Sequence, residues 1–180
     1  TAGFMDGALY KEGQQNSFPN IMAGQFEFVG GGEFNQPLAN DNVGGLLLNG
    51  NQIEPKRFVL AVDENENPAP ARLGGNSTTE ITDTQDGSFN NMGVPGAKSF
   101  HLIAPDYGNV NGVVANPPTA NPYFVRMASS PSTTVLADAI AQQPSFVSLW
   151  IGNNDVLGYA LSGGDGSNPI TPMAGPAGVG

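Results

Sequence analysis

A short polar segment near the end of the chain has the residue types of a binding or catalytic site. Gly152-Asn153-Asn154-Asp155 directly follows the apolar run 146–151. In open α/β sheets, ligands bind at the loops that follow the strands, so a polar loop in this place is a candidate site. The same residue types also populate ordinary turns, and that alternative stays open when this segment is taken alone.

Two further segments share this character. Asn91-Met92-Gly93-Val94-Pro95-Gly96-Ala97 lies in the middle of the chain, and Thr1-Ala2-Gly3-Phe4 lies at its start. Together, and in this order, the three segments resemble the conserved blocks of the GDSL/SGNH ester-hydrolase family. Thr1-Ala2-Gly3-Phe4 is similar to the residues that directly follow the family's Gly-Asp-Ser-Leu or Gly-Asn-Ser-Leu.

The resemblance implies a catalytic role for two residues. Gly96, with Gly93 as second choice, would donate its backbone N–H to the oxyanion, and Asn154 would donate its side-chain amide. Asp155, Gly152 and Asn91 would support these donors. Fixed amide donors of this kind stabilise the negative charge of acyl transfer by several kcal/mol. The resemblance implies a small-molecule or lipid ester as substrate, and neither a metal nor a cofactor.

The nucleophile and the base of this family do not match any residue of the chain. The family's base is a His with an Asp three residues before it, but the single histidine here is His101 and residue 98 is Lys98. We therefore expect the serine and the base to lie outside these residues, and the chain alone to be inactive. The alternative from a different class is a non-catalytic exported binding or surface domain on the same scaffold.

Other catalytic and metal-binding interpretations are weaker. His101 is read as a loop or helix histidine rather than a base. The acidic run 63–67 has the spacing of a calcium loop, but Pro68 and Gly74 stand where such a loop needs Gly and Glu. With no cysteine in the chain, disulfides and thiolate metal sites are excluded.

Composition restricts the partners. A net charge of -10 with six Lys and Arg residues leaves no cationic surface for nucleic acid or anionic lipid. No apolar run approaches the roughly 20 residues of a spanning helix. The low charge and the abundance of Asn, Thr and Gly predict export from a bacterial cell, to a periplasmic, outer-membrane-associated or extracellular place.

The elements expected around the candidate site form a βα unit. Apolar spacing predicts a helix over 16–26 and another over 130–144, with Ser130 as its cap and Pro144 at its end. The run 146–151 is apolar on both faces, which is typical of a buried parallel strand. The apolar pattern from Val156 onwards predicts the next helix.

At the level of the fold, we expect one α/β domain over 1–180. By resemblance it is a three-layer α/β/α, flavodoxin-like SGNH fold with a parallel sheet, incomplete here. Residues 30–90 are predicted to be a subfamily insertion rich in β structure, with a hairpin at 57–73. An incomplete sheet has an unpaired edge, so self-association through that edge is expected.

Overall fold

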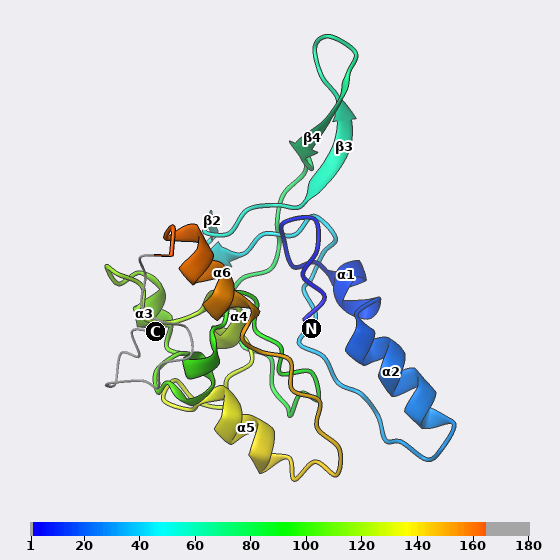
Figure 1. Ribbon diagram of the computed structural model, residues 1–180, viewed down its shortest axis with the longest axis vertical. Helices are drawn as coiled ribbons and strands as arrows, with labels where there is room; N and C mark the ends of the chain where they lie inside the picture. The colour runs from blue at the N-terminus through cyan, green and yellow to red at the C-terminus, as the bar shows by residue number, and fades with distance from the viewer. Residues whose placement is uncertain (1, 165–180) are drawn as a thin grey trace. The chain divides into compact units, whose positions relative to one another are not determined.

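The computed structural model describes residues 2–164, which form short helices and two small antiparallel sheets (Figure 1). The chain divides into two compact units. Unit 1 comprises the residues up to Gln85 together with Phe89–Pro95, and unit 2 comprises Asp86–Ser88 and the residues from Gly96 onwards. The class is therefore mixed α and β.

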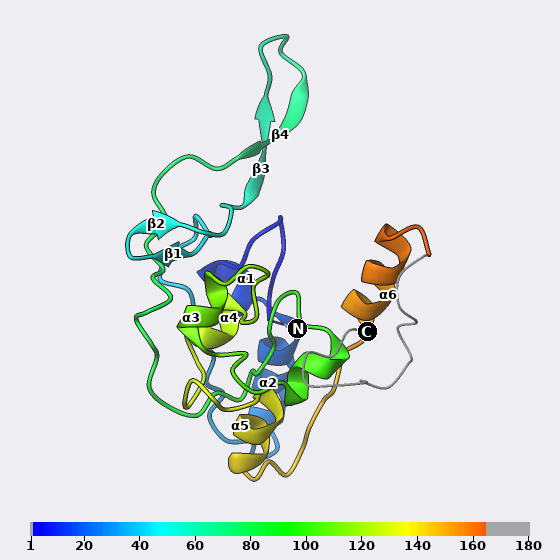
Figure 2. The same cartoon turned by 90° about the vertical axis from the view of Figure 1, so that its left-hand side faces the viewer.

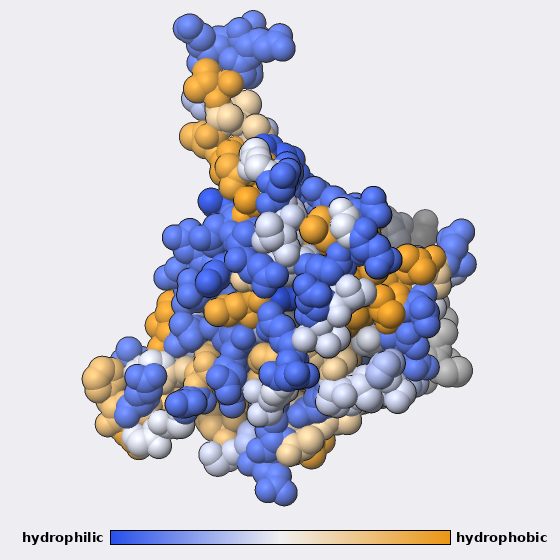
Figure 3. Space-filling model, turned by 180° about the vertical axis from the view of Figure 1, so that it is seen from behind, coloured by the Kyte–Doolittle hydropathy of each residue, from blue (hydrophilic) through white to orange (hydrophobic). Residues whose placement is uncertain are grey.

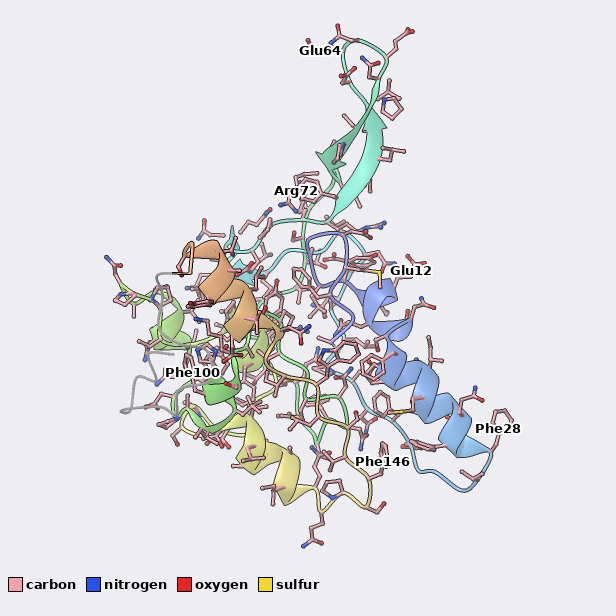
Figure 4. The ribbon with its side chains drawn as sticks, in the orientation of Figure 1. Glu12, Phe28, Glu64, Arg72, Phe100 and Phe146 are labelled. Carbon is pink, nitrogen blue, oxygen red and sulfur yellow. The ribbon has the colours of Figure 1, made fainter. Side chains whose placement is uncertain are left out.

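Unit 1 begins with two helices, α1 (Lys11–Gln15) and α2 (Phe18–Glu27). Ser17 takes the extended backbone of an N-cap and Pro19 lies in the first turn of α2, where its missing N–H costs no hydrogen bond. The helix predicted over 16–26 is thus confirmed. Just beyond α2, the ring of Phe28 is 83% exposed, and Figure 4 shows it pointing away from the helix.

A tight turn builds the smaller sheet of unit 1. β1 (Leu47–Leu48) pairs with β2 (Asn51–Gln52) through Asn49 and Gly50, whose φ angles are 52° and 76°. Positive φ at both central residues is the geometry of a type I′ hairpin turn, which Asn-Gly favours. Leu47 also forms an isolated parallel bridge with Glu80.

The larger sheet is a hairpin that projects from the rest of unit 1 (Figures 1 and 2). β3 (Phe58–Val62) pairs with β4 (Pro68–Arg72), with Phe58 opposite Arg72 and Val62 opposite Pro68. The hairpin predicted at 57–73 is therefore present.

Two arginines fix the base of this hairpin. Arg57 Nε donates to the carbonyl of Asn42 at 2.8 Å. Arg72 donates to the carbonyls of Lys56 and Gly7, and its guanidinium stacks 3.6 Å from the centroid of the Phe58 ring. The hairpin is consequently held at its base by hydrogen bonds and a cation–π contact, while its tip is solvated.

Side chains rather than strands hold the long loops of unit 1. Gln14 is buried; its amide donates to the Pro37 carbonyl at 2.9 Å and accepts from the Ala39 N–H at 2.6 Å. The Asp41 carboxylate accepts from the backbone N–H groups of Val43, Gly44 and Thr78 and from the Thr78 hydroxyl. These bonds satisfy backbone groups that have no partner in a sheet.

Unit 2 consists of short helices around an aromatic core. In order they are η1 (Ser99–Ile103), α3 (Val110–Val113), α4 (Pro122–Val125), α5 (Val135–Ala141) and α6 (Asn153–Leu161). The buried side chains come mainly from α4 and its surroundings: Tyr107, Tyr123, Phe124, Val125, Arg126, Met127 and Val135. Among residues 2–164, no helix is both long and apolar enough to span a bilayer.

The helix predicted over 130–144 is shorter than expected. α5 begins after Thr134, whose hydroxyl accepts from the Ala137 N–H at 3.0 Å, so Thr134 and not Ser130 is the cap. The preceding loop is held by Asp138, which accepts hydrogen bonds from the hydroxyls of Ser129 and Thr133. These side-chain bonds stabilise a non-helical loop ahead of the helix.

The buried strand predicted over 146–151 is wrong for the described structure. These residues belong to no strand, and Phe146, Val147, Leu149 and Trp150 are exposed. A buried strand inside a parallel sheet needs strands paired with it and cover on both faces, and residues 2–164 supply no strand that pairs with 146–151. For the same reason, no parallel sheet is present in this part of the chain.

Candidate functional site

The candidate site lies in unit 2, where the first turn of α6 meets the loop that precedes η1. Gly152 has a φ angle of 103° and is the N-cap of α6, so Asn153, Asn154 and Asp155 form the first helical turn rather than a loop. Because glycine has no Cβ, Gly152 can adopt this left-handed backbone conformation without steric strain. The glycine therefore sets the start of the helix.

Asn154 joins this turn to the loop that contains Gly96. Its side-chain Nδ2 donates to the Ala97 carbonyl at 2.8 Å. The Gly96 backbone has a φ angle of 77°, and a Cβ built there would meet no atom within 4 Å. Glycine is thus favoured at position 96 by backbone conformation and not by lack of space.

Asp155 makes a second connection between the same two segments. Its carboxylate accepts from the Ser99 N–H at 2.9 Å and from the Ser99 hydroxyl at 2.6 Å. The side chain of Asp155 is buried, and charge-assisted hydrogen bonds of this kind are stronger than neutral ones. The carboxylate therefore holds the start of η1 against the first turn of α6.

His101 stabilises the loop from the other side. Its Nδ1 accepts from the Lys98 N–H at 2.9 Å, and its ring stacks on Tyr107 with 4.4 Å between centroids. Burial, and after it the nearby Lys98 cation, lowers the pKa of His101 from 6.5 to about 4, although the Asp155 carboxylate acts in the opposite direction. The imidazole is therefore neutral near pH 7, with its proton on Nε2.

Ser99, His101 and Asp155 do not form a catalytic triad, although the residue types are present. A triad needs the serine hydroxyl to donate to histidine, which in turn donates to the carboxylate. Here the Ser99 hydroxyl donates directly to Asp155, and Nδ1 of His101 is occupied by a backbone N–H. The arrangement is structural in this chain.

Lys98 packs along α6. A Cβ built on Gly158 would lie 3.2 Å from the Lys98 Nζ and 3.3 Å from its Cε. Gly158 therefore leaves the room that the lysine side chain occupies. The ammonium lies 5.9 Å from the centroid of the Phe100 ring, which Figure 4 labels in η1.

The remaining predicted residues lie elsewhere. Asn91 and Gly93 belong to unit 1, where Asn91 donates to the Gln36 side chain at 3.1 Å and accepts from the Gly93 N–H at 3.1 Å. Thr1 lies outside the described residues. Gly3 has a φ angle of 85° and its backbone packs directly on that of Gly13 in α1.

Sequence reasoning did not find Ser99, Lys98 or the loop-holding role of His101. Ser99 and Asp155 are separated by 56 positions, so no local pattern indicates their contact. Within residues 2–164, no group of three or more His, Asp or Glu side chains is placed to hold a metal ion. Comparison with family models, with curated proteins and with solved structures gives no significant match.

Proposed function

We propose that this chain is part of a serine ester hydrolase of the SGNH type and that Gly96 and Asn154 are its oxyanion donors. The observation that carries the proposal is the hydrogen bond from the Asn154 side chain to the Ala97 carbonyl. It brings together two of the sequence segments that resemble the family, although they lie far apart in the chain. Residues 2–4 of the third segment lie in unit 1, so this segment adds sequence support alone.

The donors suit acyl transfer. A primary amide has two N–H donors, and the bond to Ala97 uses one of them. The other is left for a carbonyl oxygen that gains negative charge in the transition state. Among the described residues, the Gly96 N–H has no hydrogen-bond partner, so it is available as the second donor of the proposal. Preorganised donors of this type need no rearrangement during the reaction.

Asp155 and Ser99 position these donors in the proposal. Their hydrogen bonds join the first turn of α6 to the loop at Gly96 through a buried carboxylate. Loss of this connection would let the Asn154 amide move relative to Gly96, and misplacement of catalytic groups by about 1 Å lowers rates strongly. The nucleophilic serine and the histidine base are contributed by sequence outside these residues, within a three-layer α/β/α domain.

The test uses the protein that carries the serine. Asn154→Ala is expected to lower kcat by about 10²–10³ with little change in KM, since the donor acts mainly when the oxyanion has formed. Asn153→Ala is the matched control, because the Asn153 side chain accepts from the Trp150 indole at 2.9 Å and not from the loop at Gly96. Equal kcat values for a folded Asn154→Ala variant and the wild type would remove Asn154 from the site.

The isolated chain provides a second test. We expect it to show no turnover of a short p-nitrophenyl ester, because Ser99 is bonded to Asp155 and not to a base. Saturable hydrolysis that a serine-directed fluorophosphonate blocks would reveal a nucleophile within these residues. If the serine-carrying protein also lacks activity, the alternative of a non-catalytic exported binding domain is favoured.

A further inference from the structure

The two outer edges of the β3–β4 hairpin differ in their hydrogen-bonding groups. Asp63 donates to Asn67 across the hairpin at 2.8 Å, and Leu73 donates to Arg57 at 2.9 Å. Because bonded and non-bonded pairs alternate in an antiparallel ladder, Ala61 bonds to Ala69 and Leu60 opposite Pro70 is a non-bonded pair. The backbone groups of Leu60 and Pro70 therefore point outward from the two edges.

Proline blocks one edge and leaves the other open. The outward positions of β4 include Pro68 and Pro70, which have no N–H to donate. The outward positions of β3 are Phe58, Leu60 and Val62. The Phe58 N–H is already bonded to the Asp6 carbonyl at 2.7 Å, so the open groups of this edge are those of Leu60 and Val62.

The hairpin also lacks a polar face along its stem. Leu60 and Val62 are 77% and 67% exposed, and they share one face with Pro68 and Pro70. The opposite face is formed by Val59, Ala61, Ala69 and Ala71. Figure 3 shows this apolar stem below a hydrophilic tip. A two-stranded sheet with both faces apolar is marginal in water, and an open apolar edge favours association with another strand.

Charge is separated along the hairpin. Asp63, Glu64 and Glu66 form an acidic tip, whereas Lys56, Arg57 and Arg72 cluster at the base and make up half of the six Lys and Arg residues in the chain. Figure 4 shows Glu64 at the tip and Arg72 at the base. The Arg72 guanidinium lies over the Phe58 ring, and Phe58 belongs to the open strand β3.

We propose that a second copy of this chain pairs with β3, antiparallel and about a two-fold axis at Ala61. Leu60 of each copy then exchanges both backbone hydrogen bonds with Val62 of the other, which satisfies the open groups of the edge and leaves the bond from Phe58 to Asp6 intact. The result is a four-stranded antiparallel sheet that has the proline-blocked β4 at both of its edges.

Charge complementarity favours a second copy of the chain as the partner and favours the antiparallel orientation. Antiparallel pairing brings the acidic tip of each hairpin beside the cationic base of the other, and it does so twice because the interface is isologous. A parallel arrangement would place the two acidic tips side by side. The pairing is independent of the proposed ester hydrolysis.

The experiment measures the oligomeric state of the 180-residue chain by sedimentation velocity over a micromolar concentration series. We expect a reversible monomer–dimer equilibrium, because an interface of this small size forms a weak complex. Leu60→Pro, which removes the open N–H, and Leu60→Lys, which puts a charge on the edge, should both be monomeric. Pro70→Lys is the matched control, because it puts the same charge on the cross-strand neighbour at the other edge and should still dimerise.

Charge exchange tests the orientation. Glu64→Lys and Lys56→Glu each bring like charges together where the tip of one copy lies beside the base of the other, so each homodimer should form about tenfold more weakly. An equimolar mixture of the two variants should form heterodimers, in which both pairs are again of opposite sign. Cross-strand nuclear Overhauser contacts between Ala61 and Ala69 report that each variant keeps its hairpin.

Three outcomes would overturn the proposal. The first is a chain that stays monomeric throughout the series. The second is a dimer that persists in both Leu60 variants while their hairpins are intact. The third is a mixture of the charge variants that associates no better than either variant alone.

Discussion

The one histidine of the chain serves as a hydrogen-bond acceptor in a partly buried place. Between the rings of Phe100 and Tyr107, His101 keeps its Nδ1 on the Lys98 N–H. Protonation would add a partly buried charge near the Lys98 cation and remove this acceptor. The folded protein therefore binds a proton at His101 less readily than the unfolded chain does.

This difference predicts a loss of stability in acid. The pKa of His101 is about 4 in the folded protein against 6.5 for the ordinary group. As the pH falls below 6.5, the unfolded state binds a proton that the folded state does not, so stability declines until about pH 4 and this contribution then levels off. After allowance for solvent screening of a half-exposed ring, about 1–2 kcal/mol is expected.

Urea unfolding at a series of pH values measures this effect. The His101→Asn variant has no side chain at position 101 that titrates between pH 6.5 and 4. The difference in unfolding free energy between wild type and variant therefore separates the effect of the histidine from that of the carboxylates. Parallel stability curves for the two proteins would show that His101 does not carry the acid sensitivity.

Asp155 is expected to matter for stability as well as for the proposed catalysis. Asp155→Ala leaves the Ser99 N–H and hydroxyl without their acceptor, which should lower the free energy of unfolding by about 1–3 kcal/mol. Ser99→Ala should cost less, since the backbone bond remains. Chemical denaturation of both single variants and the double variant checks this, and strictly additive effects would contradict the contact.

At the scale of the elements, two glycines should respond in opposite ways to substitution by alanine. Gly24 lies inside α2 with open space where a Cβ would stand, so Gly24→Ala should stabilise the chain by about 0.5–1 kcal/mol. Gly50 has a φ angle of 76° in the Asn49-Gly50 turn, so Gly50→Ala should destabilise it by about 1 kcal/mol. Thermal melts measured side by side would detect the opposite signs, and equal signs would contradict the turn geometry.

Elements with strong local signals could be predicted from the sequence. Apolar spacing with Pro19 located α2, and the polar turn at 63–67 located the hairpin. The Asn49-Gly50 turn carries an equally strong local signal for the β1–β2 hairpin, although that hairpin was not predicted above. In each of these elements, a few adjacent residues determine the structure.

Other features depend on distant residues. The run 146–151 has the composition of a buried strand, but a strand forms only where neighbours pair with it, and residues 2–164 provide none. At the candidate site, the positions of Gly96, Asn154 and Asp155 followed from resemblance. Their connection through Ala97 and Ser99 did not, because it joins residues more than 50 positions apart.

For the whole molecule, the exposed apolar run 146–151 predicts a spectroscopic signature. Trp150 is the only tryptophan of the chain and its side chain is 63% exposed. Its emission should resemble that of a solvated indole and should be quenched readily by acrylamide. Fluorescence of the dilute chain measures this; a blue-shifted, protected tryptophan would show that the run is covered.

Trp150 fluorescence also distinguishes the chain alone from the proposed complete domain. If the proposed complete α/β/α domain takes up 146–151 as an interior strand, Trp150 should become protected in the protein that carries the nucleophilic serine. Emission that stays unchanged there would count against the proposed fold.

The side chains of Gln14 and Asp41, which hold the loops of unit 1, should also limit local opening of these loops. The N–H groups of Ala39, Val43, Gly44 and Thr78 belong to no helix or strand, yet each is bonded to one of these two side chains. Amide hydrogen exchange at these positions should therefore be slow, and slower than in the solvated tip of the β3–β4 hairpin. A map of exchange rates over unit 1 should follow its anchored loops rather than its regular secondary structure.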